Sequence, residues 1–172
     1  MSDRLGTVLF ADVSGSTSLY ETAGDSAALE AISTCLGAAR AATEAWGGRV
    51  VKTMGDEVMS IFPGPDAAAN AAADIQVRID ALPALAGKKL GVRIGFHHGP
   101  VLQRDDDVFG DTVNLAARIG RSDESRSARA VLIQQALELR ARFPDANHRS
   151  RVQGIERLLI DFDQLRCKRH GM

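Results

Sequence analysis

A largely apolar run near the N-terminus predicts the first strand of a sheet. Residues 6–13 are rich in β-branched and aromatic types, which favour extended backbone. A short apolar run bounded by turn residues is typical of a buried strand. Ser14, Gly15, Ser16 and Thr17 follow, and these types favour turns and helix N-caps. The sequence therefore predicts a buried strand that leads into a helix.

Helical and extended patterns alternate along the rest of the chain. An Ala-rich stretch predicts a helix over 25–45, ended by the glycines at 47–48, which are a C-cap signal. Residues 49–53 and 57–62 read as the two strands of a hairpin with a turn at 54–56. A break at 63–66 opens a second helix that runs to 82. A strand over 92–96 is followed by a return strand that begins at 99–102, with the acidic residues 105–107 in the loop of that hairpin. The remaining predicted elements are helices over 112–119 and 134–142, and strands at 130–133 and 157–162.

This order of elements, β-α-β-β-α-β-β-α-β, predicts the α+β class. We expect a ferredoxin-like mixed β-sheet with helices packed on one face. With 172 residues, 45% of them hydrophobic, the chain can bury a full core. No repeat or linker divides it, so residues 1–172 are expected to form a single domain.

Composition narrows the possible partners and location. The formal net charge is −1, so no basic field favours nucleic acid or an anionic membrane. No apolar run approaches the ~18 residues that a membrane-spanning helix needs. Cys35 and Cys167 lie far apart without a CxxC motif, which favours structural thiols in a reducing compartment. We expect a cytoplasmic protein with no membrane segment.

Two aspartates stand where predicted strands end. Asp12 closes the first strand, and Asp56 follows Gly55 in the hairpin turn. Mg²⁺ commonly binds one or two carboxylates together with substrate phosphates. The alternative is that Asp12 caps a helix and Asp56 fills a turn, both common structural roles. The helix N-terminus at 14–17 adds backbone N–H groups that bind phosphate readily.

A second polar pair lies on the predicted helix over 112–119. Asn114 and Arg118 are four residues apart and therefore project from one helix face. Arginine offers a rigid fork of donors for phosphate oxygens, and asparagine offers both a donor and an acceptor. A solvated polar face is the alternative, and spacing alone leaves both interpretations open.

Taken together, three segments resemble the class III nucleotidyl cyclases, the family of adenylate and guanylate cyclases. They occur in the family's order and at family-like separations, over roughly residues 5–120, with a weaker match at 152–155. The segments are Phe10-Ala11-Asp12 with Ser14-Gly15-Ser16-Thr17, Lys52-Thr53-Met54-Gly55-Asp56-Glu57, and Phe109-Gly110-Asp111-Thr112-Val113-Asn114-Leu115-Ala116-Ala117-Arg118.

The resemblance implies a role for each matched position. Asp12 and Asp56, with the Val13 carbonyl, would hold two divalent cations, Mg²⁺ or Mn²⁺. Arg118 would stabilise the α-phosphate and Asn114 the ribose while the 3′-hydroxyl attacks. Two cations and an arginine fork suit in-line displacement at phosphorus.

The resemblance also implies which base is read. In this family, the positions of Lys52 and Asp107 contact the purine. Lysine can donate to adenine N1, and aspartate can accept from the exocyclic amine. In sequences that resemble guanylate cyclases, Glu and Cys occupy these two positions instead. An adenylate cyclase that uses ATP is therefore expected, ahead of a cyclase for GTP or a pyrimidine nucleotide.

The family places the metal aspartates and the Asn–Arg pair on opposite chains of a head-to-tail dimer. One chain here carries both sets, so a homodimer would form two shared sites. Two departures favour a cyclase-like module of weak or no activity as the alternative. Residues 120–129 lack the family's frequent Lys-Pro-Gly turn, and Gln153 stands where the family often has Lys.

Overall fold

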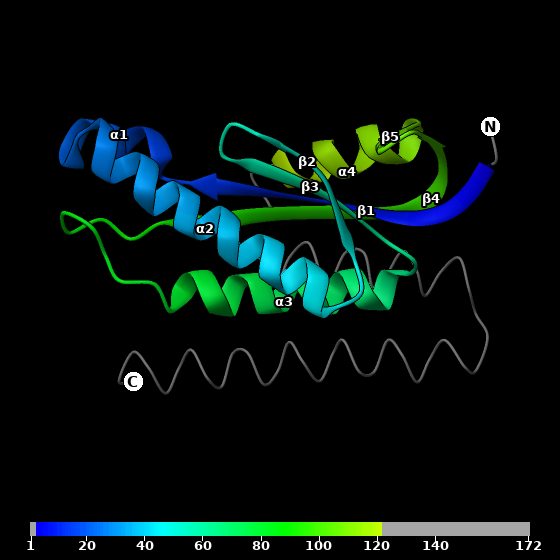
Figure 1. Ribbon diagram of the computed structural model, residues 1–172, viewed down its shortest axis with the longest axis horizontal. Helices are drawn as coiled ribbons and strands as arrows, with labels where there is room; N and C mark the ends of the chain where they lie inside the picture. The colour runs from blue at the N-terminus through cyan, green and yellow to red at the C-terminus, as the bar shows by residue number, and fades with distance from the viewer. Residues whose placement is uncertain (1–2, 122–172) are drawn as a thin grey trace.

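The computed structural model describes residues 3–121, whose strands form one antiparallel sheet in the order β2-β3-β1-β4-β5 (Figure 1). The chain order and the antiparallel pairing confirm the α+β class and the ferredoxin-like arrangement. The elements are β1 (Asp3–Ser14), α1 (Ser16–Ala23), α2 (Asp25–Ala45), β2 (Arg49–Met54), β3 (Glu57–Phe62), α3 (Pro65–Asp80), β4 (Gly91–Arg104), β5 (Asp107–Phe109) and α4 (Asp111–Arg121).

Strand β1 lies in the centre of the sheet and is buried on both faces. Successive side chains of a strand point to opposite faces. Leu9, Ala11 and Val13 pack against α2 and α3, whereas Val8 and Phe10 belong to the cluster that α4 covers. All five are 4% exposed or less. Residues Val8 to Ala11 are continuously apolar because both faces of β1 meet helices.

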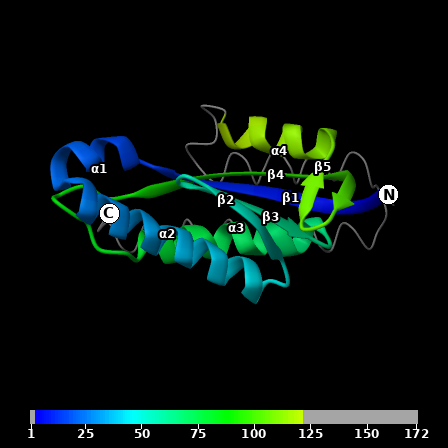
Figure 2. The same cartoon turned by 45° about the horizontal axis from the view of Figure 1, so that its top comes forward.

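One detail of the predicted fold differs. The sequence predicts helices on one face of the sheet, but Figure 2 shows α2 and α3 on one side and α4 on the other. The physical reason is the second apolar face: without α4, Val8, Phe10 and Met59 would be exposed to water.

Strand β4 also differs from the prediction. The expected turn between strands over 92–96 and 99–102 is absent, and β4 is one strand that pairs with β1 over twelve positions. In an antiparallel ladder, the N and O atoms of a residue lie on the same strand edge. The Pro100 carbonyl accepts a hydrogen bond from the Thr112 hydroxyl (2.7 Å), beyond the end of β5. The nitrogen of Pro100 lies on the same edge as its carbonyl, so the missing N–H removes no hydrogen bond from the β1–β4 ladder. Inside a strand, proline is tolerated only at such a position.

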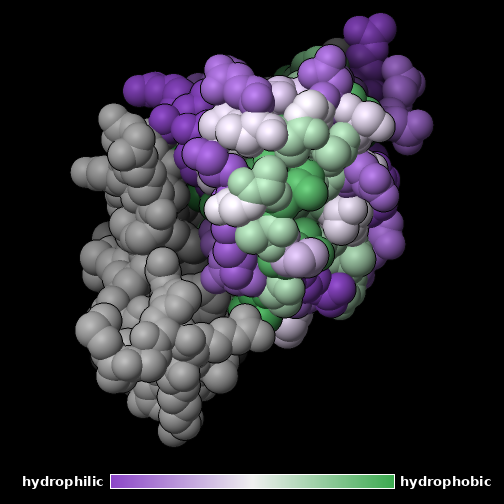
Figure 3. Space-filling view, turned by 90° about the vertical axis from the view of Figure 1, so that its left-hand side faces the viewer, coloured by the Kyte–Doolittle hydropathy of each residue, from purple (hydrophilic) through white to green (hydrophobic). Residues whose placement is uncertain are grey.

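An apolar pocket of about 220 Å³ lies between α2, the end of α3 and residues 82–90. Figure 3 looks onto the end of the molecule at the left of Figure 1 and shows hydrophobic residues at its centre, bordered by hydrophilic ones. Burial raises the pKa of the Cys35 thiol in the pocket wall. Cys35 therefore stays neutral and acts as an apolar side chain, as predicted.

The predicted elements at 130–133, 134–142 and 157–162 lie outside the described residues, as do Cys167, Gln153 and the match at 152–155. In the part that is described, no helix has both the length and the apolar character needed to cross a bilayer.

Strand β4 and helix α4 touch backbone to backbone at Gly95. A Cβ atom there would lie 2.6 Å from the Gly120 Cα and 2.8 Å from the Ala116 carbonyl oxygen. Backbone atoms cannot move aside as a flexible side chain can. We predict that Gly95→Ala lowers the free energy of unfolding, measured by urea denaturation, by at least ~2 kcal/mol.

The matched control is Gly120→Ala on the facing helix. Its Cβ would find its nearest atom, the Gly95 nitrogen, at 3.4 Å. Gly120 lies in the last turn of α4 as described, and alanine is favoured over glycine in a helix by up to about 1 kcal/mol. This variant should be as stable as the original chain or more so. Equal stability of the two variants would contradict the close approach.

Candidate functional site

The end of β1 and the β2–β3 turn bring two aspartates together. Asp12 pairs with Glu57 in the β1–β3 ladder, and the Val13 N–H donates to the Asp56 carbonyl (3.0 Å). Gly55 has a φ of 61°, a left-handed conformation that glycine adopts readily and that forms the tight turn. The two sequence-predicted carboxylates and Val13 are therefore neighbours in space.

The loop that follows β1 holds the Asp56 carboxylate. The Ser16 hydroxyl donates to Asp56 Oδ2 (2.6 Å). The N-cap of α1 is Gly15, with a φ of 91° and no side-chain cap. The predicted turn and cap segment 14–17 therefore supplies the N-cap through Gly15, while the Ser16 hydroxyl, in the first helical residue, binds Asp56. Ser14 and Thr17 lie on either side of this contact in the sequence. Because α1 starts at Ser16, its first backbone N–H groups lie near Asp56.

The Asp12 carboxylate faces an arginine from the neighbouring strand. Arg93 lies opposite Asp12 in the β1–β4 ladder, and its Nε donates to Asp12 Oδ2 (3.0 Å), as does its Nη2. Asp12 is therefore not a helix cap. Arg93 was not predicted as a site residue, although its place between the apolar Val92 and Ile94 indicates that it points away from their face.

Negative charge accumulates around Glu57. Burial raises the pKa of its carboxyl, Arg121 on α4 opposes the rise, and the nearby charges of Asp12 and Asp56 add to it. Arg121 Nη2 lies 3.7 Å from Glu57 Oε2. Three acidic side chains and the cations of Arg93 and Arg121 thus share the end of β1.

The donor set at this end fits a hard divalent cation. Asp12, Asp56 and the Val13 carbonyl are the residues that could hold it, since they carry the oxygen donors that Mg²⁺ prefers. Within residues 3–121, no three side chains of His, Cys, Asp or Glu converge on one point. Mg²⁺ usually completes its shell with water and substrate phosphates, so two carboxylates suffice for a site that is shared with a substrate.

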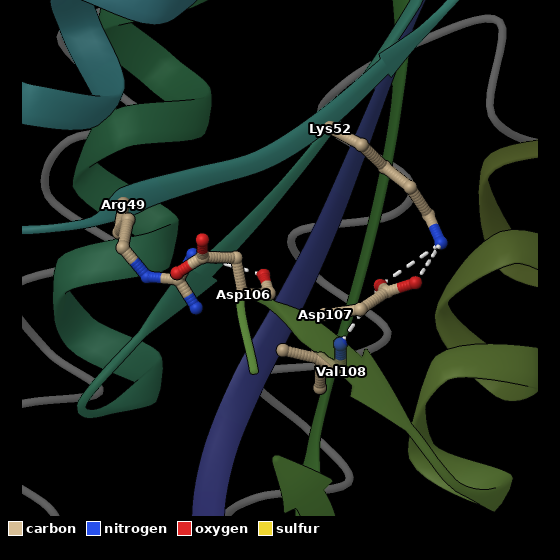
Figure 4. Close-up of polar contacts among 5 residues, drawn as sticks. All are labelled: Arg49, Lys52, Asp106, Asp107 and Val108. Atoms are coloured by element: carbon tan, nitrogen blue, oxygen red, sulfur yellow. Dashed lines mark hydrogen bonds and ion pairs between the residues drawn. The ribbon is translucent and has the colours of Figure 1, made fainter. Parts of the chain in front are cut away.

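A second predicted pair joins the two edges of the sheet. Lys52 on β2 donates to both oxygens of Asp107 on β5, at 2.9 and 2.8 Å (Figure 4). The Val108 N–H also donates to Asp107 (2.8 Å). The Lys52 bond, and then the Val108 bond, lower the pKa of the Asp107 carboxyl. Because β2 and β5 are the outermost strands of the sheet in the described part of the chain, the sheet must curl to close this contact.

Helix α4 presents the third predicted pair to solvent. Thr112, Ala116 and Gly120 recur every four residues and are buried, whereas Asn114 and Arg118 lie on the exposed side. In the described part of the chain, neither forms a hydrogen bond or ion pair with Asp12 or Asp56. The fold therefore assembles three separate groups and leaves the Asn–Arg pair available to another molecule.

Residues 4–141 match the family model described as the adenylate and guanylate cyclase catalytic domain. The chain belongs to this cyclase family. Among curated relatives, the chain is 40% identical to an adenylate cyclase of Streptomyces coelicolor over 125 residues, covering 69% of the chain and 30% of that protein. It is 34% identical to an uncharacterized protein of Mycobacterium bovis over 136 residues, covering 79% of the chain and 34% of that protein. The chain thus spans about a third of the length of these relatives.

Solved cyclase structures share the fold. A non-canonical dimeric guanylyl cyclase domain of the RhoGC fusion protein from Blastocladiella emersonii matches with a TM-score of 0.63 and 26% identity, covering 71% of this chain and 76% of that chain. An adenylate/guanylate cyclase/hydrolase from Silicibacter pomeroyi matches with a TM-score of 0.57 and 31% identity, covering 70% of each chain.

The pKa of Asp107 tests the edge contact of the cyclase domain. We predict that Lys52→Gln raises this pKa toward its usual range, because the Lys52 bond is the main cause of its depression. A depressed carboxyl pKa stabilises the fold above the unfolded pKa, and this contribution is lost as pH falls through the folded pKa. Carboxyl ¹³C titration by NMR measures the change. Lys89→Gln, on an exposed loop, should leave the Asp107 titration unaltered; a normal Asp107 pKa in the original chain would contradict the contact.

Proposed function

We propose that this cyclase domain is an adenylate cyclase that converts ATP to 3′,5′-cyclic AMP and pyrophosphate. The observation that carries the proposal is the contact between Lys52 and Asp107, at 2.8–2.9 Å. Adenine offers an acceptor at N1 and a donor at its exocyclic amine, which match an ammonium and a carboxylate side by side. Guanine presents these groups in the reverse order. A site built on such a pair rejects the wrong base, because the pair would be left unsatisfied.

The carboxylates at the end of β1 would bind the triphosphate end of the substrate. In the proposal, Asp12, Asp56 and the Val13 carbonyl hold two divalent cations, Mg²⁺ or Mn²⁺. When bound, such cations neutralise phosphate charge and favour deprotonation of the attacking hydroxyl. Ser16 holds Asp56 in place through its 2.6 Å hydrogen bond. Ser14, Gly15, Ser16 and Thr17 would bind phosphate through the N–H groups that open α1.

The chemical step is an in-line displacement at the α-phosphorus. The ribose 3′-oxygen forms a bond to this phosphorus while the bond to the oxygen of pyrophosphate breaks. Arg118 would stabilise the charge on the α-phosphate oxygens, and Asn114 would orient the ribose. Both residues lie on the exposed side of α4.

Exposure of the Asn–Arg pair supports a site shared between two chains. A head-to-tail homodimer would bring Asn114 and Arg118 of one chain to Asp12 and Asp56 of its partner, twice per dimer. We also propose a single catalytic domain over residues 1–172 and a cytoplasmic location. A cyclase-like nucleotide-binding or regulatory module is the second candidate, favoured by Gln153 at a position where lysine is frequent in the family.

Nucleotide turnover tests the reaction. With Mn²⁺, the full chain should form cyclic AMP from ATP and less cyclic product from GTP, CTP or UTP. Asp12→Ala and Asp56→Ala should each lower the rate by about 100-fold or more, since each removes a charged group that stabilises the transition state. Product is quantified by chromatography. If ATP yields no more cyclic AMP than with these variants, the module is favoured over the enzyme.

Mixing two inactive variants tests the shared site. Asp56→Ala and Arg118→Ala should each be inactive alone. Random pairing of equal amounts gives half heterodimers, each with one intact site, so about a quarter of the original activity should return. Asp56→Ala mixed with Asp12→Ala is the control and should recover nothing, because both changes affect the same half of the site. Recovery in the control, or none in the test pair, would exclude this dimer.

A further inference from the structure

Asp107 lies on a short strand at the edge of the sheet formed by residues 3–121. Among these residues, the three-residue strand β5 pairs with β4 alone, through Leu102, Gln103 and Arg104. Asp107 occupies the pair next to the turn, opposite Arg104. Its side chain is 35% exposed, so water competes for its carboxylate. A hairpin with three paired residues is marginally stable, so it fixes the position of the Asp107 carboxylate weakly unless another element also contacts the hairpin.

A bond from β2 provides this brace. Arg49 Nη1 donates to the carbonyl of Asp106 (3.1 Å), the residue directly before Asp107. Figure 4 shows Arg49 and Lys52 extending from β2 toward Asp106 and Asp107. One strand therefore holds both the backbone and the carboxylate of this segment.

A β-bulge in β2 makes the double contact possible. Two residues three positions apart normally point to opposite faces of a sheet. The register shifts between Val50 and Lys52, so that Arg49 pairs with Ile61 and Lys52 with Met59. Ile61 and Met59 belong to the same buried cluster, which places Arg49 and Lys52 on the same face. Bulges commonly redirect side chains in this way.

We propose that Arg49 is a positioning residue for base recognition: its bond to Asp106 holds the Asp107 carboxylate beside Lys52, ready to read adenine. This inference rests on the proposed function, which assigns the base to Lys52 and Asp107. Arg49 itself contacts the hairpin backbone and not the base. Without it, Asp107 moves with its edge strand, and the acceptor for the adenine amine is no longer fixed.

The position of Arg49 allows a clean test. Arg49 is exposed, and its bond is solvent-accessible, so its loss should change global stability little. Arg49→Ala is compared with Arg49→Lys, which keeps the charge but loses the planar fork. Arg40→Ala removes an exposed arginine from α2 and is the matched control.

Two measurements on the full chain separate positioning from a structural role. The first is the affinity for fluorescent analogues of ATP and GTP. The second is the hydrogen-exchange rate of the Val108 amide, which donates to Asp107. This rate is monitored by NMR in the absence of nucleotide. For Arg49→Ala we expect affinity for the ATP analogue to fall ~3- to 10-fold, with a smaller change for GTP. Val108 exchange should rise by a similar factor at unchanged Tm. Arg49→Lys should lie between, and Arg40→Ala should match the original chain.

The possible outcomes are distinct. An unchanged ATP-to-GTP ratio with unchanged Val108 exchange overturns the role of Arg49. An equal loss of affinity for both analogues overturns it as well, since base recognition is then not what Arg49 supports. If the original chain shows no preference for adenine, the proposed function fails. Faster Val108 exchange in Arg49→Ala would then still support the positioning of the hairpin.

Discussion

Burial of β1 on both faces is the constraint on which the remaining structure depends. Leu9, Ala11 and Val13 require α2 and α3, and Val8 and Phe10 require α4. Because a slip of one residue would exchange these two faces, the register of β1 with β3 and β4 is strongly fixed. That register sets Asp12 between Glu57 and Arg93. The charged cluster at the end of β1 is therefore a consequence of apolar packing along its length.

The same packing separates the candidate site residues into three places. Carboxylates gather at the end of β1, the Lys52–Asp107 pair joins the two sheet edges, and α4 turns Asn114 and Arg118 to solvent. One face of α4 is occupied by the sheet, so only its outer face can serve another molecule. In the proposed enzyme, the separation within one chain is what makes a second chain necessary.

Local patterns predicted the elements whose conformation local sequence decides. Helix α2 and strand β3 have the expected bounds, because alanine-rich and β-branched runs have clear preferences. The turn expected before Gly99-Pro100 is absent, and the Pro100 carbonyl instead bonds to Thr112, a tertiary contact that no local pattern contains. Arg93 and Arg49 were missed for a similar reason: each acts through a residue that cross-strand register or a β-bulge brings near. The aspartates were selected as candidates because three motifs together resemble one family, and the resemblance also paired Lys52 with Asp107, which lie in contact in the structure.

A crystal structure of the full chain with a non-hydrolysable ATP analogue tests the central claim most directly. The account predicts that the base lies between β2 and β5, with Lys52 Nζ donating to adenine N1 and the Asp107 carboxylate accepting from the exocyclic amine. The direct contact between Lys52 and Asp107 should be lengthened or broken by the base. An adenine bound elsewhere, with this ion pair intact at 2.8–2.9 Å, would contradict the account.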